Sequence, residues 1–460
     1  MRILRKLCAL IILGVLCVPV PVYAFIPINA PSAVLMDQAT GTVLYASNEH
    51  ARMYPAGLTK MLTALVALDY LDPQTVIVVG SEINNIPPGA LVAGHQVGEH
   101  ITVRNLLRGL MIQNGNDSGA IVAVQTVQAQ RGRGNIPYTN VMQIFSQMMN
   151  NRARTLGAFN TNFVNPNGLH HENHYTTAYD LALIARAFME HPLLREIAGE
   201  AEFIGNSLEG FEGDAEAIEG VRTVDHHWVD TNELISGGAF HYAYATGIRS
   251  GSTPQASDCL AASAERRGVR LIAVVLNSPD PGRWQDARML FDYGFATYEY
   301  HEILEEGQHI ETVAIANAML GESSILDVLA SESFTALFSQ AQIARLERTV
   351  EFDEAFMAEE GDYALALYAP IEAGEPLGTI IYTLDGEIVF EGELQAATTV
   401  EERSLDSDMD FYIAMVRDNI FSLRALPFWL GGIGVLIGIG GVALAISERR
   451  RSRRSWYNRR

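Results

Sequence analysis

Lysine is almost missing from this chain. Its 460 residues include 32 Lys and Arg together, yet the lysines are limited to Lys6 and Lys60, so arginine supplies nearly all of the positive charge. Basic residues are also few beside the 54 Asp and Glu, and the formal net charge is −22 at pH 7. A surface of this sign repels phosphate backbones, which excludes nucleic acid as the expected partner.

Cysteine is scarce as well. Of the three cysteines, Cys8 and Cys17 lie in the N-terminal apolar stretch, and Cys259 is the third. Removal of the N-terminal stretch would leave a single cysteine and exclude an internal disulfide. The exported chain must then depend on a hydrophobic core, and with 48% apolar residues it can build one.

The N-terminus is typical of a secretory signal peptide over residues 1–24. A basic start precedes the apolar stretch Leu7–Val18. Val22–Ala24 resembles a small-x-small cleavage site, so Phe25 is the expected first mature residue. An uncleaved membrane anchor is the alternative, although the apolar stretch is short for a span.

The C-terminus carries a second apolar segment. Residues 425–446 are uncharged and would extend roughly 33 Å as a helix, enough to cross a bilayer core. The Arg-rich tail 447–460 favours the cytoplasmic side by the positive-inside rule. A buried core helix is the alternative. The sequence therefore predicts a protein tethered by its C-terminus to the cytoplasmic membrane, with its body facing the periplasm or cell wall.

Between the ends, two domains are expected. Residues 25–300 carry the hairpin pattern 32–46, the apolar strands 259–264 and 269–276, and helical patterns at 60–71, 101–124 (interrupted at 113–116) and 177–190. They predict an α/β (α+β) domain, in which helices pack on an antiparallel sheet.

Residues 309–400 lose most of the helical signal. Short strands are expected at 363–368 and 378–382, with a turn at Asp385-Gly386, so this region is predicted to be a small, acidic, β-rich domain. Residues 401–424 would connect it to the membrane segment.

Four segments together resemble the low-molecular-mass penicillin-binding proteins, the serine D-Ala-D-Ala carboxypeptidases. They are Met53–Thr63 (MYPAGLTKMLT), Val103–Ala120 (VRNLLRGLMIQNGNDSGA), Phe163–Asp180 (FVNPNGLHHENHYTTAYD) and Ala245–Pro279 (ATGIRSGSTPQASDCLAASAERRGVRLIAVVLNSP). Tyr368–Leu394 is similar to the C-terminal domain of that family.

The resemblance implies a penicillin-binding/β-lactamase-like transpeptidase fold. It also implies a reaction without a cofactor, in which the last peptide bond of a peptidoglycan stem peptide ending in D-Ala-D-Ala is cleaved. Three motifs carry that chemistry: S-x-x-K, S-x-N and K-T-G. The first serine forms an acyl-enzyme, the first lysine acts as base, the second serine relays protons, and the third motif holds substrate.

This chain departs from the first two motifs. Gly57-Leu58-Thr59-Lys60 stands where S-L-T-K is expected, so Gly57 offers no nucleophile while Lys60 keeps the base. Asn114-Gly115-Asn116 stands for S-G-N, and the Asn114 amide cannot relay a proton as a hydroxyl does. Gly57, Lys60 and Asn114 thus occupy the catalytic positions, and Asn116 occupies a substrate-binding position.

The third motif is also altered. Arg249-Ser250-Gly251 stands for K-T-G and keeps a charge and a hydroxyl, and the Ser252 backbone N–H is expected in the oxyanion hole with that of Gly57. Arg249, Ser250, Gly251 and Ser252 are therefore the expected substrate-binding residues. Glu233 stands where many relatives carry a basic residue, and we expect it to neutralise Arg249.

Two other groups could attack the substrate in place of the missing serine: the Thr59 hydroxyl, or a water activated by Lys60. Thr59 should face away from the site on its helix, whereas Lys60 could activate a water in the space left by Gly57. Losing the nucleophile of a triad-like enzyme costs about a million-fold in rate, so the sequence predicts weak or absent catalysis.

No metal site is expected. The string His170-His171-Glu172-Asn173-His174 has no fixed spacing to a third ligand, and His174 matches a structural histidine of the family. His226-His227 carries even less signal. Cys259 is expected to be a buried small hydrophobe.

Three functions remain open. One is a catalytically impaired homologue that binds stem peptides or, as further partners, cell-wall enzymes. Another is an active or residual D-Ala-D-Ala carboxypeptidase in cell-wall remodelling. The third is a scaffold whose pocket has collapsed.

Overall fold

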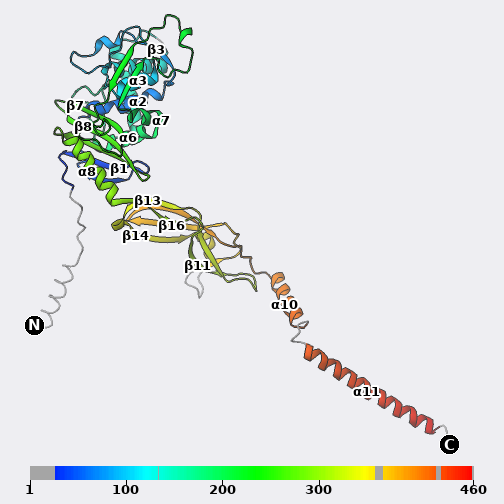
Figure 1. Ribbon diagram of the computed structural model, residues 1–460. Coiled ribbons are helices and arrows are strands. Elements are labelled where there is room, and N and C mark those ends of the chain that lie inside the picture. Colours follow the sequence, from blue (N-terminus) through cyan, green and yellow to red (C-terminus); the bar gives the residue numbers. More distant parts are fainter. Residues whose placement is uncertain (1–25, 133, 358–365, 421–425, 458–460) are drawn as a thin grey trace, which may run out of the picture. The chain divides into compact units, whose positions relative to one another are not determined.

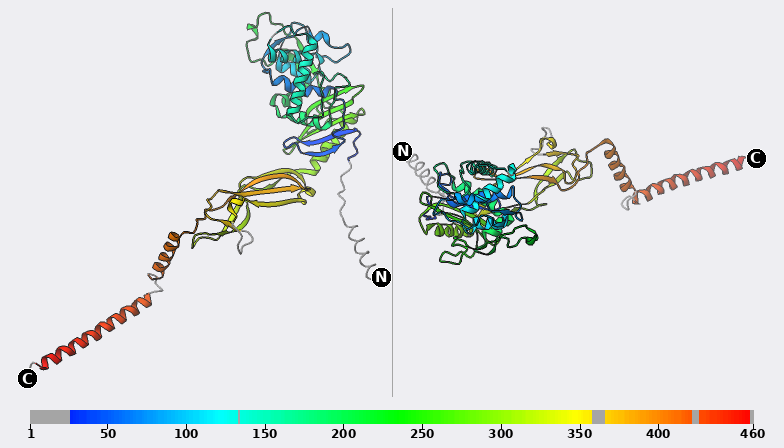
Figure 2. Two further views of the ribbon diagram at one scale, coloured as in Figure 1. Left: turned by 180° about the vertical axis from the view of Figure 1, so that it is seen from behind. Right: turned by 90° about the horizontal axis from the view of Figure 1, so that it is seen from above.

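The computed structural model describes residues 26–132, 134–357, 366–420 and 426–457 (Figure 1). The expected signal peptide 1–24 lies outside these residues. The chain divides into two compact units, one ending at Glu299 and one beginning at Tyr300. Figure 2 shows the same parts from two more sides: a mixed α/β unit, a β-rich unit and the C-terminal helices.

A five-stranded antiparallel sheet forms the centre of the first unit in the described part of the chain. Its order is β2-β1-β9-β8-β7. The strands are β1 (Ser32–Asp37), β2 (Val43–Ser47), β7 (Ala245–Thr253), β8 (Ser257–Arg266) and β9 (Val269–Ser278). The predicted hairpin and the two apolar strands are confirmed, and β7, which carries the third motif, lies at an edge.

Helices cover both faces of this sheet. Because alternate strand residues point to opposite faces, a strand covered on both sides is apolar throughout. In β9, Ile272 and Val274 belong to the core shared with α6 (Ala178–Glu190). Leu271 faces α8 (Gly282–Thr297), where a Cβ at Gly294 would lie 2.5 Å from its side chain. The sheet is therefore the middle layer of a three-layer sandwich.

A group of helices packs beside α6 on one face of the sheet (Figure 1). These are α2 (Thr59–Leu68), α3 (Val103–Met111), α4 (Asn116–Arg131), α5 (Tyr138–Thr155) and α7 (Pro192–Ala198). Threonines begin two of the helices of this unit: the Thr102 hydroxyl accepts the Asn105 N–H, and the Thr177 hydroxyl accepts the Asp180 N–H. The predicted break between α3 and α4 is confirmed.

Short elements complete the first unit. They are the 3-10 turns η1 (Ala56–Leu58), η2 (Ser81–Asn85) and η3 (Ala215–Ala217) and the strand pairs β3 (Val76–Val78) with β4 (His100–Thr102) and β5 (Glu202–Asn206) with β6 (Asp225–Val229). η1 leads directly into α2, so the first motif sits on a helix N-terminus.

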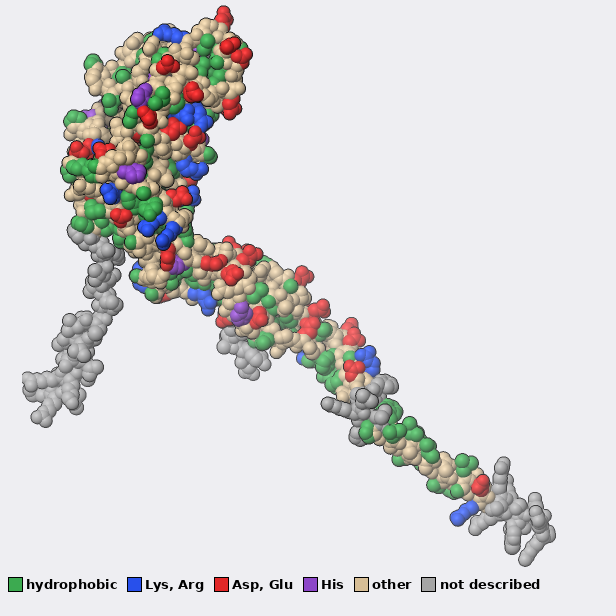
Figure 3. Space-filling view, viewed as in Figure 1, with side chains coloured by type: hydrophobic (Ala, Val, Ile, Leu, Met, Phe, Trp, Pro, Cys, Tyr) green, Lys and Arg blue, Asp and Glu red, His purple; other side chains and the backbone are tan. Residues whose placement is uncertain are grey.

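The second unit is β-rich, as predicted. Among the described residues it holds a six-stranded sheet of order β14-β16-β17-β12-β11-β15, and β10 (Tyr298–Leu304) pairs with β13 (Phe334–Ser339). The six strands are β11 (His309–Ala316), β12 (Ile325–Ala330), β14 (Leu346–Phe352), β15 (Ala366–Tyr368), β16 (Pro376–Leu384) and β17 (Glu387–Ala396); α9 (Gln340–Ile343) and η4 (Glu354–Phe356) lie between them. Its surface displays many acidic side chains (Figure 3).

Two helices follow the second sheet. α10 (Leu405–Ile420) occupies the predicted connector, and α11 (Leu426–Tyr457) contains the predicted apolar segment. Trp429–Arg450 is long and apolar enough to cross a membrane, and none of it is buried by other described residues. Its apolar side chains are visible along the helix in Figure 3.

A substitution at Gly168 would test the close packing of its loop against η1, which carries the first motif. Gly168 has a φ of +80°, and a Cβ there would lie 1.7 Å from the Ala56 carbonyl oxygen in η1. We expect Gly168→Ala to lower the free energy of unfolding by more than about 3 kcal/mol, because it adds backbone strain to a direct clash.

Gly210→Ala is the matched control. Gly210 also has a positive φ, +73°, but nothing lies within 4 Å of its Cβ position. Gly210→Ala should therefore lower the free energy of unfolding by only about 1 kcal/mol. Chemical denaturation measures both, and equal losses would contradict the clash.

Candidate functional site

A small cavity gathers residues from the first two predicted motifs and from the strand residues that directly follow the third. Its volume is about 190 Å³. It is lined by Gly57, Lys60, Asn114, Asn116 and Ser252, together with Gly89, Ala90, Leu91, Asn167, Gly168, Leu169 and Thr253. Of the other expected site residues, Arg249, Ser250 and Gly251 lie on β7 next to the cavity but do not form its wall. The cavity therefore lies between η1, the α3–α4 turn and the edge strand β7.

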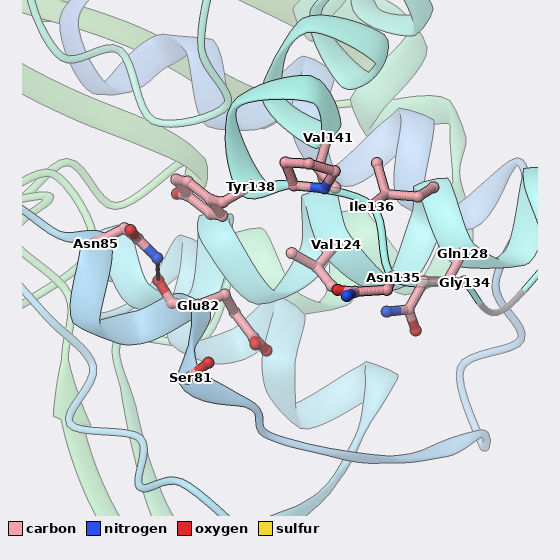
Figure 4. Close-up of a pocket in the computed structure, with 11 residues that line it drawn as sticks. Ser81, Glu82, Asn85, Val124, Gln128, Gly134, Asn135, Ile136, Tyr138 and Val141 are labelled. Atoms are coloured by element: carbon pink, nitrogen blue, oxygen red, sulfur yellow. Dashed lines mark hydrogen bonds between the residues drawn. The ribbon is translucent and has the colours of Figure 1, made fainter.

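A second cavity, of about 240 Å³, lies elsewhere in the first unit between η2 and the loop that joins α4 to α5 (Figure 4). Its polar lining groups include Glu82, Gln128 and Tyr138, and the Asn85 amide donates to the Glu82 carbonyl (3.1 Å). None of the predicted site residues reaches it, so the smaller cavity is the candidate site.

Lys60 is the central polar group of the site. Its side chain is only 1% exposed, and Nζ donates to Asn116 Oδ1 (3.0 Å) and to the Asn167 carbonyl (2.9 Å). Burial lowers the Lys60 pKa well below its usual value; the nearby Arg249 cation adds to this effect, and Asp117 opposes it. A neutral amine has two N–H groups and one lone pair. In the neutral form these two hydrogen bonds would use both N–H groups and would leave the lone pair available to accept a proton.

A side chain at Gly57 would be in tight contact with Asn114. A Cβ at this position would lie 3.2 Å from Asn114 Oδ1 and 3.4 Å from Gly251 Cα. Asn114 sits in the α3–α4 turn with φ +62°, and its Oδ1 is buried without a hydrogen-bond partner among the described residues. The Asn114 amide oxygen thus crowds the space into which a residue-57 side chain would extend.

Gly251 allows β7 to approach η1 closely. A Cβ on Gly251 would be 2.5 Å from the Gly57 backbone nitrogen. Glycine at both positions therefore permits direct contact between the two backbones. The adjacent Ser250 is buried, and its Oγ is 2.9 Å from Thr231 Oγ1. The expected contribution of the Gly57 and Ser252 N–H groups to an oxyanion hole stays a prediction.

Asn116 and Asp117 fix the far wall of the cavity. The Asn116 side-chain amide donates to the Leu91 carbonyl (2.9 Å). The Asp117 carboxylate accepts backbone N–H groups from Ala93 (2.7 Å), Gly94 (2.9 Å) and His95 (3.2 Å). The start of α4 therefore holds the loop that passes over the site.

Arg249 is a buried cation with little compensation. It is fully buried, and none of its three guanidinium nitrogens has a hydrogen-bond partner among the described residues. Burial lowers its pKa, and the neighbouring Asp230 acts in the opposite direction. Burial raises the pKa of Asp230 to about 6, although Arg249 pulls it down. A guanidinium without hydrogen-bond partners among the described residues is therefore buried next to the cavity.

The expected ion pair between Glu233 and Arg249 is not formed within the described parts of the chain. Glu233 is half-buried, and Asp230 is the carboxyl that acts on Arg249. The physical reason is that residues 230–234 form a turn, in which Asp230 accepts the Asn232 N–H (2.8 Å) and Asn232 accepts the Leu234 N–H (3.1 Å). Sequence analysis missed Asp230 and the Asn167 carbonyl, because neither lies within a catalytic motif.

The histidine string 170–174 forms no group of three potential metal ligands in the described structure. His174 is buried, its Nε2 is 2.9 Å from Thr59 Oγ1, and burial lowers its pKa to about 3. It therefore acts as a neutral packing residue behind α2. Cys259 is buried as expected, and burial raises its pKa to about 12.

Known proteins match the chain over most of its length. A family model described as D-alanyl-D-alanine carboxypeptidase matches residues 21–280, and one described as penicillin-binding protein 5, C-terminal domain, matches residues 298–402. Among curated proteins, the D-alanyl-D-alanine carboxypeptidase DacF of Bacillus subtilis strain 168 is 29% identical over 375 residues, covering 80% of this chain and 85% of DacF.

Solved structures of the same family also match the chain. Penicillin-binding protein 5 from Haemophilus influenzae covers 82% of this chain with 98% of its own, at a TM-score of 0.58 and 26% identity. The Streptomyces K15 DD-transpeptidase covers 58% of this chain with 98% of its own, at a TM-score of 0.51 and 31% identity.

The raised pKa of Asp230 predicts a pH dependence of stability. As the pH rises, the unfolded state loses this proton near 3.8 and the folded state near 6, so the folded state binds more protons in between. The free energy of unfolding should therefore fall between about pH 4 and pH 6, by up to about 3 kcal/mol from this group. Asp230→Asn should remove this part of the slope.

Denaturation followed by tryptophan fluorescence at several pH values checks this expectation. Asp225→Asn, at an exposed position on β6, is the matched control and should keep the wild-type slope. Parallel curves for the wild type and Asp230→Asn would show that the burial of Asp230 is not what governs the slope.

Proposed function

The chain belongs to the D-alanyl-D-alanine carboxypeptidase family, and from this premise we propose that it is a membrane-anchored member that binds peptidoglycan stem peptides and is catalytically impaired. The proposal places the D-Ala-D-Ala terminus of the stem peptide in the 190 Å³ cavity. The observation that carries it is the absence, within the described residues, of a hydroxyl bonded to the Lys60 amine.

The hydroxyls of Thr59, Ser118 and Ser250 are used elsewhere. The hydroxyl of Ser252, which lines the cavity, makes no hydrogen bond to Lys60 in the described structure. Thr59 Oγ1 donates to the Ala56 carbonyl (2.9 Å) and contacts His174. Ser118 Oγ is bonded to His95 (2.9 Å), and Ser250 Oγ to Thr231. Lys60 is instead bonded to Asn116 and Asn167. Without an alcohol for the base to deprotonate, no acyl-enzyme can form. Loss of the nucleophile typically lowers the rate about a million-fold.

The binding half of the reaction is better preserved. A stem peptide ends in a carboxylate, and the buried guanidinium of Arg249 has three nitrogens without protein partners in the described structure. A carboxylate that reached Arg249 would supply the charge-assisted hydrogen bonds that it lacks. Asn116 and Ser252 add polar groups to the cavity wall.

A residual carboxypeptidase is the second candidate, and one observation favours it. Lys60 lines the cavity with a lowered pKa and an unused lone pair, so it could deprotonate a water beside Gly57. Direct attack by that water on the terminal peptide bond would release D-Ala without a covalent intermediate. Cell-wall enzymes are further candidate partners for the binding function.

The anchoring half of the proposal depends on α11. Its segment Trp429–Arg450 can span a membrane by length and composition. The arginines that follow favour the cytoplasmic side, which would leave both units exported, in the periplasm or facing the cell wall.

Covalent labelling by a fluorescent penicillin tests the catalytic impairment. We expect no label on the wild-type chain after denaturation, since no alcohol is positioned to be acylated. Gly57→Ser alone should label weakly, because its Cβ meets Asn114 Oδ1 at 3.2 Å and the relay hydroxyl is still missing. Gly57→Ser combined with Asn114→Ser should label strongly.

Gly57→Ala is the control for the added Cβ, since it brings the same crowding without a hydroxyl, and it should remain unlabelled. Labelling of the wild type would overturn the impaired-enzyme proposal. Release of D-Ala by the unlabelled wild type, lost in Lys60→Met, would instead favour water activation by Lys60.

Peptide binding tests the other half of the proposal. Isothermal titration of the full chain with a pentapeptide ending in D-Ala-D-Ala should show reversible binding. The same peptide with an amidated C-terminus should bind roughly 10–100-fold more weakly, because it loses the charge-assisted hydrogen bonds to the guanidinium. Absence of binding by both peptides would leave the scaffold as the remaining hypothesis.

A further inference from the structure

Two histidines and a glutamate meet in the interior of the first unit, outside the cavity described above. His95 and Glu99 lie in the loop between η2 and β4, and His226 lies on β6. Exposure is 6% for His95, 0% for Glu99 and 6% for His226. These three residues, called the His-Glu-His cluster below, each place one potential ligand atom within 4.8 Å of the others.

We propose that the His-Glu-His cluster is a binding site for a divalent transition-metal ion of the zinc class. Its ligand set, two imidazoles and one carboxylate, is one that zinc accepts with a water in the fourth position. The inference does not rest on peptide binding or catalysis.

The spacing of the ligand atoms fits a metal centre. Glu99 Oε1 is 3.3 Å from His95 Nδ1 and 2.7 Å from His226 Nε2. Ligand atoms around a tetrahedral zinc ion lie roughly 3.4 Å apart. The first distance already matches, and the second has to open by roughly 0.7 Å, which a side-chain adjustment can provide.

The outer contacts also fit. Ligating histidines usually bond their second ring nitrogen to an oxygen, and this fixes the ring orientation. The second nitrogen of His95, Nε2, is 2.9 Å from Ser118 Oγ. The second oxygen of Glu99, Oε2, accepts the Gln96 backbone N–H (2.9 Å). Two of the three proposed ligands, His95 and Glu99, are thus oriented by a second hydrogen bond on the side away from the ion.

Charge gives an independent reason for a cation. Glu99 is fully buried, and in the described structure its ion-pair partners within 4.0 Å are the two histidines, with no lysine or arginine among them. Buried charges in proteins are paired with a charge of opposite sign or bound to a metal ion, and hydrogen bonds from imidazole N–H groups are only a partial substitute. A divalent ion would compensate this charge.

The cluster would also brace the candidate site. The loop that carries His95 and Glu99 includes Leu91, which lines the cavity, and its backbone is bonded to Asp117 at the start of α4. Trp228 on β6 stacks on His226 (4.5 Å between ring centroids, 26° between planes), and its Nε1 donates to the Ala93 carbonyl (2.9 Å). A bound ion would therefore tie this loop to β6.

Trp228 is a built-in reporter for the test. The full chain, purified without a histidine tag and stripped with EDTA, is titrated with ZnCl₂ while fluorescence, bound zinc and Tm are recorded. We expect one tightly bound equivalent that changes the fluorescence of Trp228, and a rise in Tm of roughly 5 °C at zinc concentrations 100 times Kd.

Matched variants separate this site from surface histidines. His226→Gln and Glu99→Gln should lose the tight equivalent, whereas His227→Gln should keep it, because His227 is exposed and bonded to Glu202 instead. Ser118→Ala removes only the outer partner and should weaken binding about 10-fold.

The wild-type chain alone can refute the proposal. If the stripped protein takes up no stoichiometric zinc, or if His226→Gln and His227→Gln retain equal amounts, the cluster is a hydrogen-bonded core group and not a metal site. Glu99→Gln is nearly isosteric and keeps the proposal testable should His226→Gln not fold.

Discussion

The amine of Lys60 holds the site together. Through two hydrogen bonds it joins α2 to Asn116 at the start of α4 and to the carbonyl of Asn167 in the loop before Gly168. These segments are far apart in the sequence, and each forms part of the cavity wall. Arginine could not make the same compact contact, because its planar guanidinium is larger and stays charged. This gives a physical reason why the mature chain, which otherwise uses arginine, keeps a lysine at this position.

Two basic groups, Lys60 and Arg249, are buried at the site, and their neighbours affect their charges in different ways. Lys60 can be neutral because burial and Arg249 both disfavour its cation. Burial lowers the pKa of Arg249 as well, and the nearby Asp230 carboxyl acts in the opposite direction. The consequence is a cavity lined by a lysine whose cation is disfavoured, with a poorly compensated guanidinium buried beside it. Such a pocket favours an anionic ligand and disfavours a cationic one.

Much of the fold could be predicted from local patterns. The hairpin β1–β2, the break between α3 and α4 and the strands β8 and β9 follow from hydrophobic periodicity and turn residues, which act over a few positions. The motif positions around Gly57, Asn114 and Arg249 were also predicted, because chain order and spacing carry them. Contacts that depend on long-range packing could not be predicted in this way. Asp230 was missed in favour of Glu233, since three residues of a turn decide which carboxyl faces inward. His95 and Glu99 meet His226 only through the fold, and no spacing rule connects them.

The burial of Lys60 also affects the outside of the molecule. Lys6 belongs to the expected signal peptide, and Lys60 is 1% exposed. Removal of that peptide would leave a surface from residue 26 onward that presents guanidinium and imidazole groups but no side-chain primary amine. Aldehydes, activated esters and enzymes that acylate or cross-link exposed lysines would find only the chain's own α-amino group. The amine chemistry by which most protein surfaces are tagged or cross-linked would then be limited to that single group.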